Sequence, residues 1–155
     1  MTVATRDKTL SDSAARLRLA ITRTARRLRQ EAAGELSPTS AATLATVEGH
    51  GPLTPSEVAE IERIRRPSAT RSLRCLEDSG LVRRTPDPAD GRSSLVSVTA
   101  AGRERLRRLR GRKNAYLARR MRDLPPTDVE ALERAAEILE RIQESERQAV
   151  EGERG

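Results

Sequence analysis

Apolar residues recur at steps of three or four over most of the chain, which is the pattern of amphipathic helices. The first such stretch covers residues 12–33, and Gly34 ends it. Residues 37–49 predict a second helix, because a capping serine followed by proline opens this stretch. The Thr-Pro-Ser-Glu sequence at residues 54–57 has the form of a capping box and predicts the start of a short third helix.

The pattern changes after a fourth predicted helix, which begins near residue 67 or 68 and ends at Gly80. Residues 81–85 and 94–99 have the pattern of two strands, and the segment between them is rich in turn-forming residues. Thr99 is placed to cap a long fifth helix, which the two prolines at 125 and 126 end. A last helix follows, with apolar steps of three and four like those of a coiled-coil seam.

These elements predict a mainly α fold with a small β wing. The third helix, a tight turn and the fourth helix form a candidate helix-turn-helix, and the strands after it form the wing. Long helices flank this lobe on both sides in the sequence. We expect a flexible N-terminal segment at 1–11, a single domain at 12–147 and a polar tail at 148–155, with the winged helix-turn-helix lobe at 37–99 and a helical region at 12–36 and 100–147.

Composition narrows the possible partners. The chain of 155 residues has no Trp or Phe and a single Tyr, so it lacks the aromatic platform on which single-stranded nucleic acids stack. Its 30 basic and 23 acidic residues give a net charge of +7, and nearly all the basic residues are Arg, which suits phosphates and guanine edges. Residues 100–123 carry ten basic and two acidic groups and 124–155 four and nine, so the two segments can pair.

Several classes of site are excluded by the residues available. One Cys (Cys75) and one His (His50) allow neither a disulfide within the chain nor a Cys/His zinc site. We find no nucleophile–base pair, glycine-rich phosphate loop or metal-ligand cluster, and therefore expect no enzyme, cofactor or metal. No apolar run has the length of a membrane span, so we expect a cytoplasmic protein without a membrane partner. Cys75 is interpreted as a packing residue, and its redox activity stays open.

The fourth helix has one apolar and one basic side. On a helical wheel, Ala69, Ser72, Leu73 and Leu76 share a side that we expect to be buried. The other side would then face a DNA major groove, since Arg can donate twice to guanine and Thr offers a hydroxyl or a methyl group. A solvated basic helix face is the alternative interpretation. The predicted recognition-helix contacts are Pro67, Ser68, Thr70, Arg71 and Arg74.

Three segments give the chain a family resemblance. They are Arg-Pro-Ser-Ala-Thr-Arg at 66–71, Leu-Glu-Asp-Ser-Gly-Leu-Val-Arg-Arg at 76–84, and Asp-Gly-Arg at 90–92 followed by Val-Thr-Ala-Ala-Gly at 98–102. In these residues and their spacing the chain resembles the MarR family of transcription regulators. The resemblance implies a winged helix-turn-helix homodimer in which the first, fifth and last helices form the dimerisation region.

The resemblance also implies roles for the wing. The arginine that matches Arg92 enters the minor groove, and the aspartate that matches Asp90 steadies it; a turn-forming role is the alternative for Asp90. Many members have a second Arg between these positions, where this chain has Gly91. We expect Arg83 and Arg84 to contact phosphates or to remain solvated.

The predicted function is that of a sequence-specific, DNA-binding transcriptional regulator. We expect a homodimeric repressor of a pseudo-palindromic operator on double-stranded DNA, released by a small-molecule effector. Members of the family often bind small aromatic acids, and Tyr116 is a candidate for lining such a pocket or for packing. A protein–protein interaction module and a ligand-independent DNA-binding protein are the alternative functions.

Overall fold

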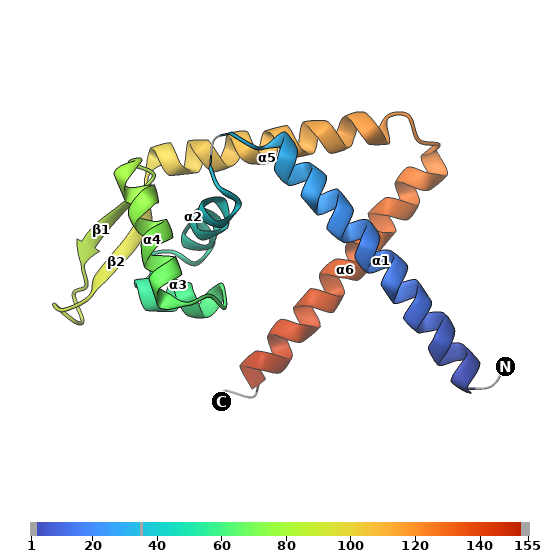
Figure 1. Cartoon of the computed structure of the whole chain (residues 1–155), viewed down its shortest axis with the longest axis horizontal. Helices are drawn as coiled ribbons and strands as arrows, with labels where there is room; N and C mark the ends of the chain where they lie inside the picture. Colours follow the sequence, from blue (N-terminus) through green and yellow to red (C-terminus); the bar gives the residue numbers. More distant parts are fainter. Residues whose placement is uncertain (1–2, 35, 153–155) are drawn as a thin grey trace. The chain divides into compact units, whose positions relative to one another are not determined.

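The computed structural model describes residues 3–34 and 36–152. Its elements divide into two compact units, one up to Tyr116 and one from Leu117 onward. The elements in chain order are α1 (Val3–Glu31), α2 (Pro38–His50), α3 (Pro55–Ile61), α4 (Arg66–Asp78), β1 (Val82–Pro86), β2 (Ser94–Val98), α5 (Ala100–Met121) and α6 (Pro126–Gly152) (Figure 1). The predicted fold class, mainly α with a small two-stranded sheet, is confirmed.

Side-chain caps fix the helix starts that the sequence predicts. The Ser37 hydroxyl accepts a hydrogen bond of 3.1 Å from the Ser40 backbone N–H at the start of α2. At α3 the capping box is complete, because Thr54 accepts from the Glu57 N–H while the Glu57 carboxylate accepts from the Thr54 N–H at 2.7 Å. Thr99 caps α5 as Ser37 caps α2, since its hydroxyl accepts from the Gly102 N–H.

The outer helices extend further than the sequence analysis expected. Helix α1 begins at Val3, so residues 3–11, which the sequence analysis expected to be a flexible segment, are helical. Helix α6 continues through Gly152, so most of the predicted polar tail is helical, while residues 153–155 lie outside the described part. Both extensions have the same cause, because neither contains a proline that would break a helix. In α6, the first glycine after Pro126 is Gly152, so no glycine ends this helix earlier.

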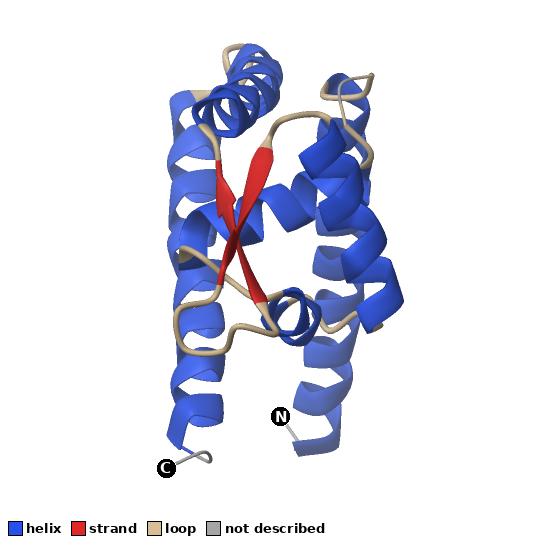
Figure 2. Ribbon diagram, turned by 90° about the vertical axis from the view of Figure 1, so that its left-hand side faces the viewer, coloured by secondary structure: helices blue, strands red, loops and turns tan. Residues whose placement is uncertain are grey.

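The core of the first unit lies between α2, α3, α4 and the two strands. Strands β1 and β2 form a twisted antiparallel pair in which Val82 lies opposite Val98 (Figure 2). Leu53, just before α3, pairs with Val96 and so attaches the helix-turn-helix to the wing. Side chains with almost no exposure fill the space between these elements: Leu44, Val47, Val58, Leu73, Leu76 and Val96.

A close contact fixes the start of α5 against the wing. A Cβ on Gly102 would lie 2.2 Å from the Leu81 carbonyl oxygen and 2.8 Å from Val98 Cγ2. The same Leu81 oxygen accepts hydrogen bonds from the Thr99 N–H at 3.0 Å and from the Thr99 hydroxyl at 3.1 Å. Only glycine allows this approach of helix to strand.

Candidate nucleic-acid interface

The rotation of helix α4 about its own axis is fixed, because one side of the helix is packed in the core. Ala69, Leu73 and Leu76 have no exposed surface, and Ser72 is 6% exposed. These are the four residues that the helical wheel places on the buried side, so that prediction is confirmed. Since the inner side is fixed, the residues that α4 turns to solvent are fixed as well.

The outward side of α4 gathers most of the predicted reading residues. Pro67, Thr70, Arg71 and Arg74 line one shallow surface hollow together with Arg66. Ser68 lies in an adjoining hollow, which it shares with Arg71 and the exposed Cys75. Sequence reasoning did not select Arg66, although Arg66, Thr70 and Arg74 are spaced at steps of four and form one stripe.

A buried hydrogen-bonded chain of polar side chains holds α4 against the rest of the helix-turn-helix. The Ser72 hydroxyl donates to the Thr43 hydroxyl oxygen of α2 at 3.0 Å, and the Thr43 hydroxyl donates to Glu62 Oε2 at 3.2 Å. Glu62 is the residue that ends α3. The sequence analysis placed Ser72 inside but did not identify Thr43 or Glu62 as its partners.

The wing tip is an ordered turn with an exposed arginine. Asp90 Oδ1 accepts a hydrogen bond of 3.0 Å from the Arg92 backbone N–H, and the Asp90 carbonyl accepts one of 2.8 Å from the Ser93 N–H. The contact between Asp90 and Arg92 therefore goes to the backbone rather than to the guanidinium, in agreement with the turn-forming alternative. Arg92 is exposed at the tip.

The two strand arginines differ in their surroundings. Arg84 is half-buried, and its Nε donates to Glu77 Oε2 of α4 at 2.8 Å while its Nη1 donates to the Ser94 hydroxyl at 3.3 Å. Arg83 is exposed and donates to the Ser97 hydroxyl across the sheet at 3.1 Å. Arg84 therefore connects the wing to α4 through a partly exposed ion pair.

The single His and the single Tyr of the chain both make contacts within the protein. His50 lies with Nδ1 3.0 Å from the Thr46 carbonyl. The Arg27 guanidinium lies over the ring of Tyr116, 5.6 Å from its centroid, as in a cation–π contact. Within residues 3–34 and 36–152, no group of His, Cys, Asp or Glu could hold a metal ion, and none of the helices there could span a membrane.

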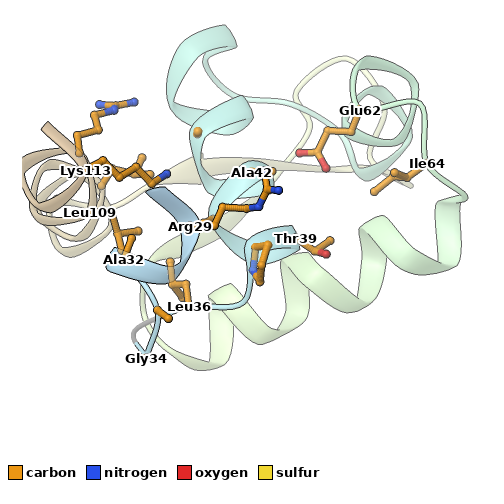
Figure 3. A pocket seen from close by; sticks show the side chains of 16 residues that line it. Arg29, Ala32, Gly34, Leu36, Thr39, Ala42, Glu62, Ile64, Leu109 and Lys113 are labelled. Carbon is orange, nitrogen blue, oxygen red and sulfur yellow. The ribbon is translucent and has the colours of Figure 1, made fainter. Parts of the chain in front are cut away.

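The first unit also contains a cavity of about 910 Å³ (Figure 3). Its walls come from the end of α1, from α2, from the residues just after α3, and from α5. Tyr116 is not among its lining residues, so this residue packs against Arg27 instead of lining the cavity.

Known proteins with similar sequences are transcriptional regulators. The MarR family model matches residues 36–94. A helix-turn-helix-type transcriptional regulator of Mycobacterium leprae is 39% identical over 131 residues, which is 83% of this chain and 92% of that protein. One of Mycobacterium bovis is 36% identical over 124 residues, covering 79% and 87% of the two chains.

Solved structures agree with this assignment. A transcriptional regulator from Pseudomonas aeruginosa is 33% identical and superposes with a TM-score of 0.77 over 89% of this chain and 96% of that one. A MarR-family protein from Bacillus stearothermophilus, 17% identical, shares the fold with a TM-score of 0.75 over 88% and 96%. The chain therefore belongs to the MarR family, whose members are DNA-binding transcriptional regulators and not enzymes.

Proposed function

We propose that this regulator binds a pseudo-palindromic operator as a homodimer and represses transcription from it. The observation that carries the proposal is the outward side of α4, where Arg66, Arg71 and Arg74 surround Thr70 above a fully buried inner side. A helix of this kind presents its N-terminal half to base edges in the major groove. Bidentate donation from Arg to guanine then supplies sequence preference.

The wing supplies a second contact in the same proposal. Arg92, exposed at the tip of an ordered turn, enters the neighbouring minor groove, where a narrow and electronegative groove attracts arginine. Pro67 and Ser68 lie at the start of α4, close to the backbone of the duplex, and Arg83 contacts phosphates. A related fold, a single-residue mutant of MepR from Staphylococcus aureus, was solved bound to an oligodeoxyribonucleotide; it is 17% identical, with a TM-score of 0.65 over 84% of this chain and 97% of that one.

Exposed apolar side chains on the outer helices support the homodimer. Leu10 is 69% exposed on α1, and Ile142 is 50% exposed on α6. Large apolar side chains left in water in this number mark a surface that a partner covers. We assign the dimerisation region to residues 12–36 and 100–147, outside the lobe at 37–99. The other exposed large apolar residues of these helices and of the turn between α5 and α6 are Leu17, Leu19, Ile21, Leu117, Leu124, Leu132 and Ile138.

The test starts from duplexes selected from a random pool by the full-length protein. Light scattering measures the oligomeric state, and fluorescence anisotropy measures affinity across a salt series. We expect a dimer, a symmetric motif with half-sites ~34 Å apart, and a steep loss of affinity with salt. A monomer without preference among duplexes would refute the proposal.

Single variants test the reading face. Arg71→Ala and Arg74→Ala each remove one cation and should cost ~1–3 kcal/mol on the selected duplex but much less on random duplex. Arg134→Ala removes the same charge from an exposed position of α6 and is the matched control. If all three variants lose affinity equally on both duplexes, the assigned reading face is wrong.

Ligand release is the regulatory part of the proposal. The cavity of about 910 Å³ has the size of a small-molecule site and lies in the same unit as the helix-turn-helix. A molecule that binds more tightly when α4 is in one position than in another would shift α4 toward that position. Operator affinity would then change by no more than the difference between the molecule's affinities for the two positions.

A further inference from the structure

The turn that joins α3 to α4 has an arginine where the other helix ends of the first unit have glycine. Among the described residues, a positive φ occurs at Gly34, Gly51 and Gly80, which follow the ends of α1, α2 and α4. The remaining residue with a positive φ is Arg63, with a φ of 51°, in the turn after α3 (Figure 1). This left-handed backbone favours glycine, because a Cβ there comes close to the following carbonyl oxygen.

The contacts of the turn require the left-handed backbone at Arg63. The Arg63 N–H donates to the Glu60 carbonyl at 3.1 Å, and the Ile64 N–H donates to the Ala59 carbonyl at 3.0 Å. These two hydrogen bonds form a Schellman motif, which ends a helix through one left-handed residue. Ile64 then packs against the core to which Ala59 belongs. Because these contacts hold the backbone, the strain stays at Arg63.

No contact of the Arg63 side chain within the described chain accounts for this strain. The side chain is exposed, and its guanidinium has no hydrogen bond or ion pair within residues 3–34 and 36–152. Arg84, by contrast, is paired with Glu77. Strained positions of this kind gather where a side chain serves function, so the observation directs attention to what Arg63 can bind outside the chain.

Arg63 is close along the chain to the outward side of α4. Arg66 is three positions further on, so the two Cα atoms are at most ~11 Å apart. Arg66 lines the hollow that also contains Thr70 and Arg74. In the proposed function this end of α4 enters the major groove, and the sugar-phosphate backbone borders that groove on both sides. The long side chain of Arg63 can therefore reach a phosphate at the edge of the groove.

We infer that Arg63 binds a phosphate of the operator backbone, and that this contact offsets the strain of the turn. The role rests on the proposed function and adds to it a residue that sets affinity without reading bases. A guanidinium suits this ligand, because it donates two parallel hydrogen bonds to the oxygens of one phosphate. Since every duplex carries the same phosphates, the contact supports binding to all sequences equally.

Urea unfolding of the DNA-free protein tests the strain. Arg63→Gly removes the Cβ from the left-handed position, so the unfolding midpoint should rise by ~0.5 M. Arg63→Ala keeps a Cβ there and should leave the midpoint within ~0.2 M of the parent's. A midpoint that does not rise in Arg63→Gly would overturn the inference, because the turn would then hold no strain for DNA binding to offset.

Fluorescence anisotropy on the selected and random duplexes tests the phosphate contact. Both uncharged variants, Arg63→Gly and Arg63→Ala, should bind each duplex about fivefold or more weakly than the parent. In the proposed homodimer two contacts are lost, so the slope of log affinity against log salt should become shallower by ~2. Arg63→Lys keeps the charge and should retain the parent's salt slope. Arg134→Ala on α6 is again the matched control and should change neither affinity nor slope.

The outcomes that contradict the phosphate contact differ from one another. If Arg63→Gly binds both duplexes as the parent does, Arg63 is a solvated side chain and the inference is wrong. A loss confined to the selected duplex would assign Arg63 to base reading and would overturn the phosphate contact. A loss in Arg63→Gly without one in Arg63→Ala would overturn it as well, because flexibility of the turn would then be the cause.

The parent protein separates the failure of this inference from that of the proposed function. A parent that binds no duplex refutes the proposed function, and the role of Arg63 falls with it. A parent that prefers the selected duplex, together with an Arg63→Gly variant of unchanged affinity and salt slope, refutes the role of Arg63 alone.

Discussion

The contact between Gly102 and the wing leads to a prediction whose sign is not obvious. Gly102 lies in the first turn of α5, and replacing a helical glycine by alanine ordinarily stabilises a helix by ~1 kcal/mol. Here the added Cβ would lie 2.2 Å from the Leu81 carbonyl oxygen, 0.8 Å inside the 3.0 Å that Cβ atoms essentially never pass. The obstacle is backbone, so it cannot rotate away.

The steric term should exceed the helix-propensity gain. Overpacking of this kind costs ~1–3 kcal/mol, and moving the Leu81 carbonyl also strains its hydrogen bonds from Thr99, each worth ~1 kcal/mol. We therefore expect Gly102→Ala to lower the free energy of unfolding by ~2–3 kcal/mol net. Val98 Cγ2, at 2.8 Å, adds to the crowding from the other strand.

Gly111→Ala is the matched control in the same helix. Gly111 has no atom within 4 Å of its added Cβ, so this variant should gain up to ~1 kcal/mol. Urea unfolding measures both variants at one fixed protein concentration, because the stability of the proposed homodimer would depend on concentration. We expect the midpoint to fall by about 1 M or more for Gly102→Ala and to rise slightly for Gly111→Ala. Equal shifts of the same sign would show that the contact does not constrain the fold.

Other predictions concern the core, the caps and one ion pair. Leu73→Ala removes a fully buried side chain of α4 and should destabilise by ~2–5 kcal/mol in urea unfolding, whereas Thr54→Ala, which removes the cap of α3, should cost ~1 kcal/mol. The hydrogen bond from Arg107, its charge, and then the charge of Arg108 hold the pKa of Glu104 below its usual 4.5. In an NMR titration, Arg107→Ala should therefore return that pKa toward 4.5 more than Arg108→Ala does, and the reverse order would contradict the assignment.

Local patterns predicted the helix-turn-helix well because each signal acts within a few residues. The cap at Thr54 and the apolar side of α4 around Leu73 depend only on spacing along one helix, and tertiary packing agrees with both. The ends of α1 and α6 were less predictable, since no proline or early glycine marks them and the residues there favour helix.

Contacts between distant segments were beyond the sequence pattern. Glu62 and Thr43 are 19 residues apart, and no periodicity relates the end of α3 to the middle of α2. Arg84 was expected to contact phosphates or to remain solvated because its charge is visible in the sequence, whereas its pairing with Glu77 depends on how the wing folds back on α4. For Asp90, the choice between holding a guanidinium and forming a turn depends on the three-dimensional geometry of the wing tip.

The ion pair between Arg84 and Glu77 joins the two elements that we assign to the two grooves of DNA. Because β1 is attached to α4 in this way, and Leu53 attaches the wing again through Val96, the lobe has little freedom to vary the distance between its own two reading elements. We expect an operator half-site to tolerate no inserted base pair between its guanine positions and its minor-groove position. In the proposed homodimer, adaptation to different operators would then have to occur between the two protomers, as a change in the separation of their two lobes.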